Sequence, residues 1–159
     1  MKLKIIVLLQ LILVNLSCSH QLKPDINNNI SKVTQKNTKI DKIIVTEQTR
    51  GTNRSLTYLA SGIITSVNGV ETKSPMTSIE WENIIKETNI LDLSKISSYE
   101  SLTTGRYSDR ALASKIIITS GSNTYESSTF DEGIPPKELD ALYRLLKNKS
   151  GIGTKPKIR

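Results

Sequence analysis

Apolar and polar residues change their spacing several times along this chain, and the changes divide it into segments. An apolar run near the N-terminus is followed by a polar stretch, up to Ile40, in which the apolar residues have no period. From Asp41 onward, short runs typical of β-strands are interrupted twice by runs with the three- and four-residue spacing of helices. The pattern therefore predicts several strands, a helix, two further strands and a final helix.

Runs rich in β-branched residues, separated by short turns, predict the strands. Asn68-Gly69 is the strongest turn signal, because it suits a type I′ hairpin in which both central residues have positive φ. Ile116-Ile117-Ile118 is a continuous apolar run of the kind found in a central strand. The extended runs are residues 42–49, 55–60, 62–67, 111–119 and 124–130.

Two runs with helical spacing predict two amphipathic helices. Thr77 and Glu80 form a capping box at the start of the first helix, which is expected to end near Asn89. Pro135-Pro136 is expected to open the second helix, because proline is tolerated best in the first turn. The apolar stripe of the second helix consists of Leu139, Leu142, Tyr143, Leu145 and Leu146.

This order of elements predicts an α+β fold. We expect an antiparallel sheet of about four to five strands with two helices packed on one face. The single domain is expected to span residues 41–148, which is long enough to bury an adequate core. Residues 18–40 are expected to form a flexible tether, because they hold too few apolar residues to offset the entropy of ordering. Residues 149–159 are expected to form a disordered basic tail.

The first 17 residues have the composition of a secretory signal peptide. Lys2 and Lys4 precede an apolar run of roughly 10–12 residues, which is shorter than the roughly 20 residues of a membrane-spanning helix. Leu16-Ser17-Cys18 resembles a bacterial lipobox, in which the cysteine is acylated and becomes the new N-terminus. Asn15 stands where the strict lipobox has leucine, so the match is to the looser form of Bacteroidetes-type bacteria. An ordinary signal peptide cleaved nearby is the alternative.

Cys18 is the only cysteine of the chain, so no disulfide can form within it. A lone thiol beside a signal cleavage site is explained most simply as the acylated residue, and several acyl chains hold a protein stably on a membrane. Ser19, with no acidic run after it, is similar to the pattern of lipoproteins sent to the outer membrane and left facing the periplasm. The sequence therefore predicts a palmitate-carrying lipoprotein of the cell envelope.

The net charge of +7 is carried by the ends of the chain. Residues 41–143 contain 10 basic and 14 acidic residues, whereas residues 144–159 contain six basic residues and no acidic one. A nucleic-acid-binding domain is expected to have a basic stripe interleaved with aromatic residues, so we expect no nucleic-acid partner. The basic tail either contacts anionic lipid headgroups or simply stays solvated.

Histidine and cysteine, which many enzyme mechanisms use, are missing from the predicted domain. The only histidine is His20, so residues 41–148 contain neither His nor Cys, which excludes Ser-His-Asp and Cys-His catalysis. Zinc could be held only by carboxylates, and there is no glycine-rich phosphate loop. We therefore expect no catalytic residues, no metal and no cofactor.

Two acidic pairs are the remaining candidates for acid–base chemistry. Glu80 and Glu82 lie in the first turn of a predicted helix, where acidic residues are favourable for structural reasons. Asp131 and Glu132 lie in a predicted turn before the last helix, where they can cap free N–H groups. An enzyme that uses Asp131 or Asp109 is the least favoured of the hypotheses.

The longest predicted loop, residues 99–110, ends in Arg106-Tyr107-Ser108-Asp109-Arg110. Tyr and Arg dominate the binding energy of protein interfaces. The candidate partner-binding residues are therefore Arg106, Tyr107, Asp109 and Arg110, together with Asp131. The alternative is that Asp109 pairs with Arg106 or Arg110 and only orders the loop.

Residues 41–147 resemble small uncharacterised lipoproteins of the flavobacterial type. The matching features are the helix with Trp81, the motif Arg106-Tyr107-x-Asp109-x-Ala111, and residues 124–136. Such families carry no established activity, so the resemblance implies no function. The missing catalytic residues and the Arg106-Tyr107 loop instead favour a non-enzymatic, membrane-tethered module that binds a partner or maintains the envelope.

The order of elements is also similar, more faintly, to that of emfourin, a protein inhibitor of protealysin-like metalloproteases. Shared points are Arg50-Gly51 after an early strand, a central helix, paired strands and Pro136-x-x-Leu139-x-x-Leu142. Gly51-Thr52-Asn53 stands where that family has a glycine-glycine-aromatic motif, so no inhibitory residue is carried over. A periplasmic metalloprotease inhibitor is therefore the alternative function.

Overall fold

The computed structural model describes residues 39–150. They belong to one compact unit. The predicted signal peptide, the acylated Cys18, most of the tether and the basic tail after residue 150 lie outside the described residues.

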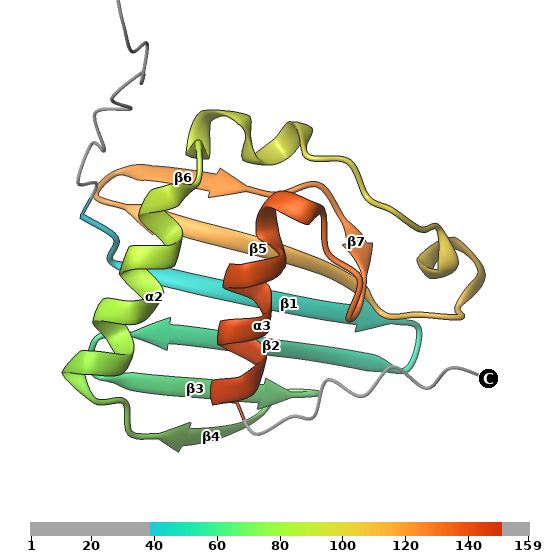
Figure 1. Ribbon diagram of the computed structural model, residues 1–159. Coiled ribbons are helices and arrows are strands. Elements are labelled where there is room, and N and C mark those ends of the chain that lie inside the picture. The colour runs from blue at the N-terminus through green and yellow to red at the C-terminus, as the bar shows by residue number, and fades with distance from the viewer. Residues whose placement is uncertain (1–38, 151–159) are drawn as a thin grey trace, which may run out of the picture. The chain divides into compact units, whose positions relative to one another are not determined.

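The described chain is built on one antiparallel sheet of seven strands (Figure 1). Neighbouring strands follow the order β4-β3-β2-β1-β5-β6. Strand β7 also pairs with β5, at the opposite end of β5 from β6. The strands are β1 (Lys42–Thr49), β2 (Thr52–Leu59), β3 (Gly62–Val67), β4 (Val70–Ser74), β5 (Ala113–Ser120), β6 (Asn123–Glu126) and β7 (Phe130–Asp131). The α+β class is confirmed, although the prediction of four to five strands was too low.

Two local features explain the additional strands. The arm after Asn68-Gly69 pairs with β3 over five residues and forms β4. The predicted strand 124–130 is divided because its pairing with β5 changes register by one residue, as at a β-bulge. At this point Ser127 Oγ accepts the hydrogen bond of Ile116 N, at 3.0 Å, where a backbone carbonyl would otherwise do so.

The hairpin turn between β3 and β4 has the predicted geometry. Asn68 has φ of 51° and Gly69 has φ of 87°, as a type I′ turn requires. The Asn68 side chain also accepts a hydrogen bond from Asn53 N of β2, at 2.8 Å.

Helix α2 (Ser78–Ile90) begins with the predicted capping box. Glu80 N donates to Thr77 Oγ1, and Thr77 N donates to Glu80 Oε2. Lys149 Nζ also donates to Glu80 Oε1, at 2.7 Å. The hydrogen bonds from Lys149 and Thr77 lower the pKa of Glu80 to about 2, so this carboxylate has a structural role.

The last helix begins later than predicted. Residues Lys137–Leu139 form a short 3-10 helix, η4, and the α-helix α3 runs from Asp140 to Lys149. Two further 3-10 helices lie between α2 and β5: η2 (Leu93–Ser98) precedes the predicted loop 99–110, and η3 (Gly105–Ser108) lies within it.

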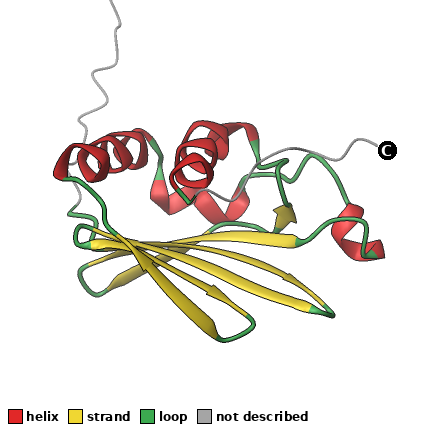
Figure 2. Cartoon of the chain, turned by 90° about the horizontal axis from the view of Figure 1, so that it is seen from below, coloured by secondary structure: helices red, strands yellow, loops and turns green. Residues whose placement is uncertain are grey.

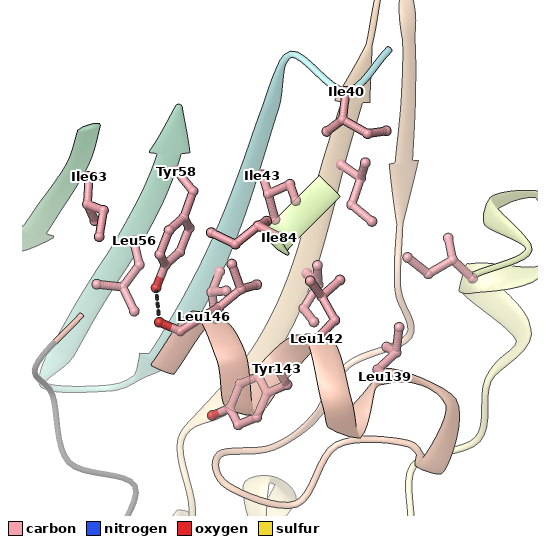
Figure 3. Packing of buried hydrophobic residues seen from close by; sticks show 14 of the residues in the cluster. Ile40, Ile43, Leu56, Tyr58, Ile63, Ile84, Leu139, Leu142, Tyr143 and Leu146 are labelled. Carbon is pink, nitrogen blue, oxygen red and sulfur yellow. Dashed lines mark hydrogen bonds between the residues drawn. The ribbon is translucent and has the colours of Figure 1, made fainter. Parts of the chain in front are cut away.

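Both α-helices cover the same face of the sheet, as predicted (Figure 2). The apolar residues of that face and of the helices form one core (Figure 3). Tyr58 reaches from β2 to donate a hydrogen bond to Leu146 O of α3, at 2.7 Å. Ile40, which was assigned to the tether, is only 5% exposed and belongs to this core, so the folded part begins before Asp41.

Candidate functional site

The carboxylate of Asp131 organises the segment that contains most of the candidate partner-binding residues. Thr103 Oγ1 and Gly105 N donate to Asp131 Oδ2, at 2.7 and 2.6 Å. Arg106 N and Arg106 Nη1 donate to Oδ1, at 3.0 and 3.1 Å. Asp131 is held in β7 by pairing with Ala113 of β5, so the sheet fixes the position of this carboxylate.

Gly105 allows the backbone to approach Asp131 this closely. A Cβ atom at Gly105 would lie 2.8 Å from Asp131 Oδ2, which is closer than real Cβ contacts. Any other residue here would therefore force either the turn or the carboxylate to move.

Two opposing effects act on the pKa of Asp131. Burial raises the pKa, but the hydrogen bonds from Thr103, Arg106 and Gly105 together outweigh burial, so the net pKa is lower than usual. Asp131 is thus an ionised carboxylate whose two oxygens both accept hydrogen bonds, which is poorly suited to general acid–base catalysis.

Arg106 lies between Asp131 and the exposed Tyr107. Its side chain is 7% exposed, and its Nη1 also donates to Ser101 Oγ and Thr103 O. Its guanidinium carbon lies 4.3 Å from the centre of the Tyr107 ring, and its Nη2 donates to Tyr107 Oη at 3.0 Å. Tyr107 is nevertheless 77% exposed. The exposed ring of Tyr107 is therefore held in place by the buried and hydrogen-bonded side chain of Arg106.

A shallow groove of about 450 Å³ adjoins this ring. Its lining is mostly polar and comes from the end of η2, the following loop and the bulge between β6 and β7. Ser128 Oγ donates to Tyr99 O, which joins two of these segments. The lining residues are Ser97, Ser98, Tyr99, Glu100, Ser101, Arg106, Tyr107, Ser128 and Thr129. Such a groove offers hydroxyl groups to a polar partner and two tyrosine rings for packing.

The structure brings together Arg106, Tyr107 and Asp131, but not the other two candidates. Asp109 has φ of 54° and lies 3.5 Å from Arg50 Nε at the turn between β1 and β2. It pairs with neither Arg106 nor Arg110, and its partner in this exposed pair, Arg50, was not predicted. The side chain of Arg110 is exposed.

A second polar cluster, which the sequence did not predict, lies under α3. Glu47 of β1 is 0% exposed and Lys147 of α3 is 1% exposed, and Lys147 Nζ lies 2.5 Å from Glu47 Oε1. Arg54 pairs with the other Glu47 oxygen and with Glu132. Tyr143 Oη donates to Glu47 Oε1 at 3.2 Å. We refer to Glu47, Arg54, Glu132, Tyr143 and Lys147 as the buried charge cluster.

The alternating pattern contained a signal for this cluster. Glu47 is in phase with Ile43 and Val45, so it had to share their buried face. Lys147 follows Tyr143 by four residues and therefore lies on the apolar stripe of α3. Its charges are paired with one another under the helix, so breaking one pair is expected to be costly, and the cluster leaves no unpaired charge for recognition.

Residues 39–150 contain no group of three or more His, Cys, Asp or Glu that could hold a metal ion. Among the same residues, no helix combines the length and the hydrophobicity needed to cross a membrane.

No family model matches this chain, and the comparisons with curated proteins and with solved structures gave no match either.

Proposed function

We propose that this protein is an outer-membrane lipoprotein of the cell envelope, facing the periplasm, that binds another envelope protein through Tyr107 and the adjoining groove. The observation that carries the proposal is the exposed ring of Tyr107 on the buried Arg106–Asp131 pair. A ring held in place before binding loses little conformational entropy when a partner covers it. Tyrosine and arginine are also the residue types most enriched at energetic centres of interfaces.

The same site is a poor candidate for catalysis. Asp131 has a lowered pKa, and both of its oxygens are used by the turn that it supports. Asp109, the other candidate carboxylate, is exposed and lies beside Arg50 at the far end of the loop. These two geometries support a binding module rather than an enzyme.

Replacing Cys18 by alanine is expected to release the protein from the membrane fraction, because the acyl chains would have no attachment point. Fractionation of cells that produce the full chain measures this. A Ser19→Ala variant is the control and is expected to stay membrane-bound. If Cys18→Ala also stays in the membrane fraction, the lipoprotein proposal is wrong.

A photoreactive residue, p-benzoylphenylalanine, at position 107 is expected to form a cross-linked adduct of one discrete mass in the envelope of living cells. The ring of Tyr107 is replaced by another aromatic ring, so the contact with the partner is kept. The control places the same residue at Ile90, which is 61% exposed and lies outside the groove. No adduct at position 107, or an equal adduct at position 90, contradicts the proposal.

Inhibition of a metalloprotease stays a prediction of the resemblance to emfourin alone, and no contact in the described residues adds to it. Titration of this protein against thermolysin-type proteases decides between the two functions. If a micromolar excess of the protein gives no inhibition, the inhibitor hypothesis is wrong.

A further inference from the structure

The two edges of the sheet differ in how they are covered. On one side, the outermost strand β6 packs beside η2. On the other side, β4 is the outermost strand (Figure 1). All five of its residues are exposed. An uncovered edge strand presents a row of free N–H and C=O groups that can pair with another strand.

The hairpin register determines which backbone groups of β4 are free. The hydrogen bond across the type I′ turn directs Val70 N–H toward β3, and the alternation of an antiparallel ladder directs Thr72 and Ser74 the same way. The N–H and C=O groups of Glu71 and Lys73 therefore point away from the sheet.

The sequence of β4 is complementary to itself in the antiparallel direction. When two copies pair about Thr72, Glu71 of each copy lies opposite Lys73 of the other, and Val70 lies opposite Ser74. Glu71 and Lys73 are the residues whose free backbone groups would form the hydrogen bonds of this pairing. Opposite charges at facing positions stabilise a pair of strands.

Exposed apolar residues lie close to the same edge. Val70 is 71% exposed, and Val67, its partner across the turn, is 41% exposed. Both lie on the face of the sheet that carries the helices, because they are in phase with the buried Ile63. In the symmetric pairing, Val70 faces the partner's Ser74, close to the start of the partner's α2.

We propose that two copies of this protein associate through antiparallel pairing of their β4 strands about Thr72, which joins the two sheets into one. The partner is a second copy because the register, the free backbone groups and the charges all match under one two-fold axis. The pairing is independent of the groove and of Tyr107. Since two five-residue strands bury little surface, the association is weak and reversible.

Disulfide trapping in the full chain tests this arrangement. In the proposed dimer, the two Thr72 residues form a pair without backbone hydrogen bonds, with Cα atoms about 4.5 Å apart, a distance that a disulfide can span. Cells that produce Thr72→Cys are expected to give a dimer on non-reducing gels that disappears on reduction. The native chain carries Cys18 as well and provides the baseline.

Two controls make the result specific to this register. Val70→Cys alone is expected not to cross-link, because the two positions would be roughly 13 Å apart. The double variant Val70→Cys/Ser74→Cys is expected to cross-link, because these positions face each other. Cross-linking of Val70→Cys as readily as Thr72→Cys overturns the proposal, and so does absence of a dimer from membrane-bound Thr72→Cys.

Charge exchange provides a second readout. In the Thr72→Cys chain, Glu71→Lys places two like-charge pairs across the symmetric interface and is expected to weaken association roughly tenfold. Adding Lys73→Glu restores two opposite-charge pairs and is expected to restore the dimer. Equal cross-linking in all three chains contradicts the pairing.

Discussion

Replacing Glu47 by alanine is expected to lower the free energy of unfolding by about 3–5 kcal/mol, because it leaves Lys147 buried without its main counter-charge. Lys147 Nζ lies 2.5 Å from Glu47 and 3.3 Å from Glu132, which is 29% exposed. Arg54 and the hydroxyl of Tyr143 lose a partner as well. Urea unfolding followed by the fluorescence of Trp81, the only tryptophan, measures the change.

Two further variants test whether the loss of stability comes from the unpaired buried charge of Lys147. The double variant Glu47→Met/Lys147→Met removes both charges, and Arg54 keeps Glu132, so most of the lost stability is expected to return. Lys115→Met removes one partner of an exposed pair with Glu126, and a change of at most about 1 kcal/mol is expected. A loss below about 1 kcal/mol for Glu47→Ala contradicts the importance of the buried charge cluster.

Replacing Asp131 by asparagine is expected to cost about 3–5 kcal/mol and to release the turn that carries Tyr107. Asparagine has nearly the same shape, but it brings one amide donor toward groups that are themselves donors. The side chains of Asp131 and Arg106 are 4% and 7% exposed, so the guanidinium would stay buried without a counter-charge. Urea unfolding measures the loss of stability.

The pH dependence of this effect has a definite sign. The pKa of Asp131 in the folded protein lies below its ordinary value of 3.8. The stabilisation that it provides is therefore complete above about pH 5 and is lost as the pH falls through the ordinary pKa and then the lower folded pKa. The difference in stability between the native chain and Asp131→Asn is expected to be constant near neutral pH and to shrink in acid.

Asp109→Asn is the matched control for this variant. Asp109 pairs with Arg50 at the surface, and its positive φ suits asparagine as well as aspartate. A change of at most about 1 kcal/mol is expected. Equal losses in the two variants would mean that the position of Asp131 under the turn has no special role.

The sequence predicted the features that depend on neighbouring residues. The Asn68-Gly69 hairpin and the capping box of Thr77 and Glu80 have the predicted geometry, because a few adjacent residues determine each of them. The sequence did not predict the division between β6 and β7, because it depends on a hydrogen bond from Ile116 to the side chain of Ser127.

The candidate site was predicted only in part, because its conformation also depends on residues that are distant in the sequence. The Arg106-Tyr107 motif marks the loop, but its conformation depends on Asp131, 26 residues after Gly105. Asp109 finds its partner at Arg50, far away in the sequence. Glu47 and Lys147 are separated by 100 residues. Strand alternation and helical spacing could therefore indicate that each side chain is buried, but not that the two meet.

The most direct test of the proposed function combines the photoreactive residue at position 107 with the two carboxylate variants. The adduct is measured in living cells at equal amounts of membrane-bound protein. We predict that Asp131→Asn abolishes most of the adduct, whereas Asp109→Asn leaves it unchanged. An undiminished adduct in Asp131→Asn would contradict the claim that the buried carboxylate holds Tyr107 in its binding position.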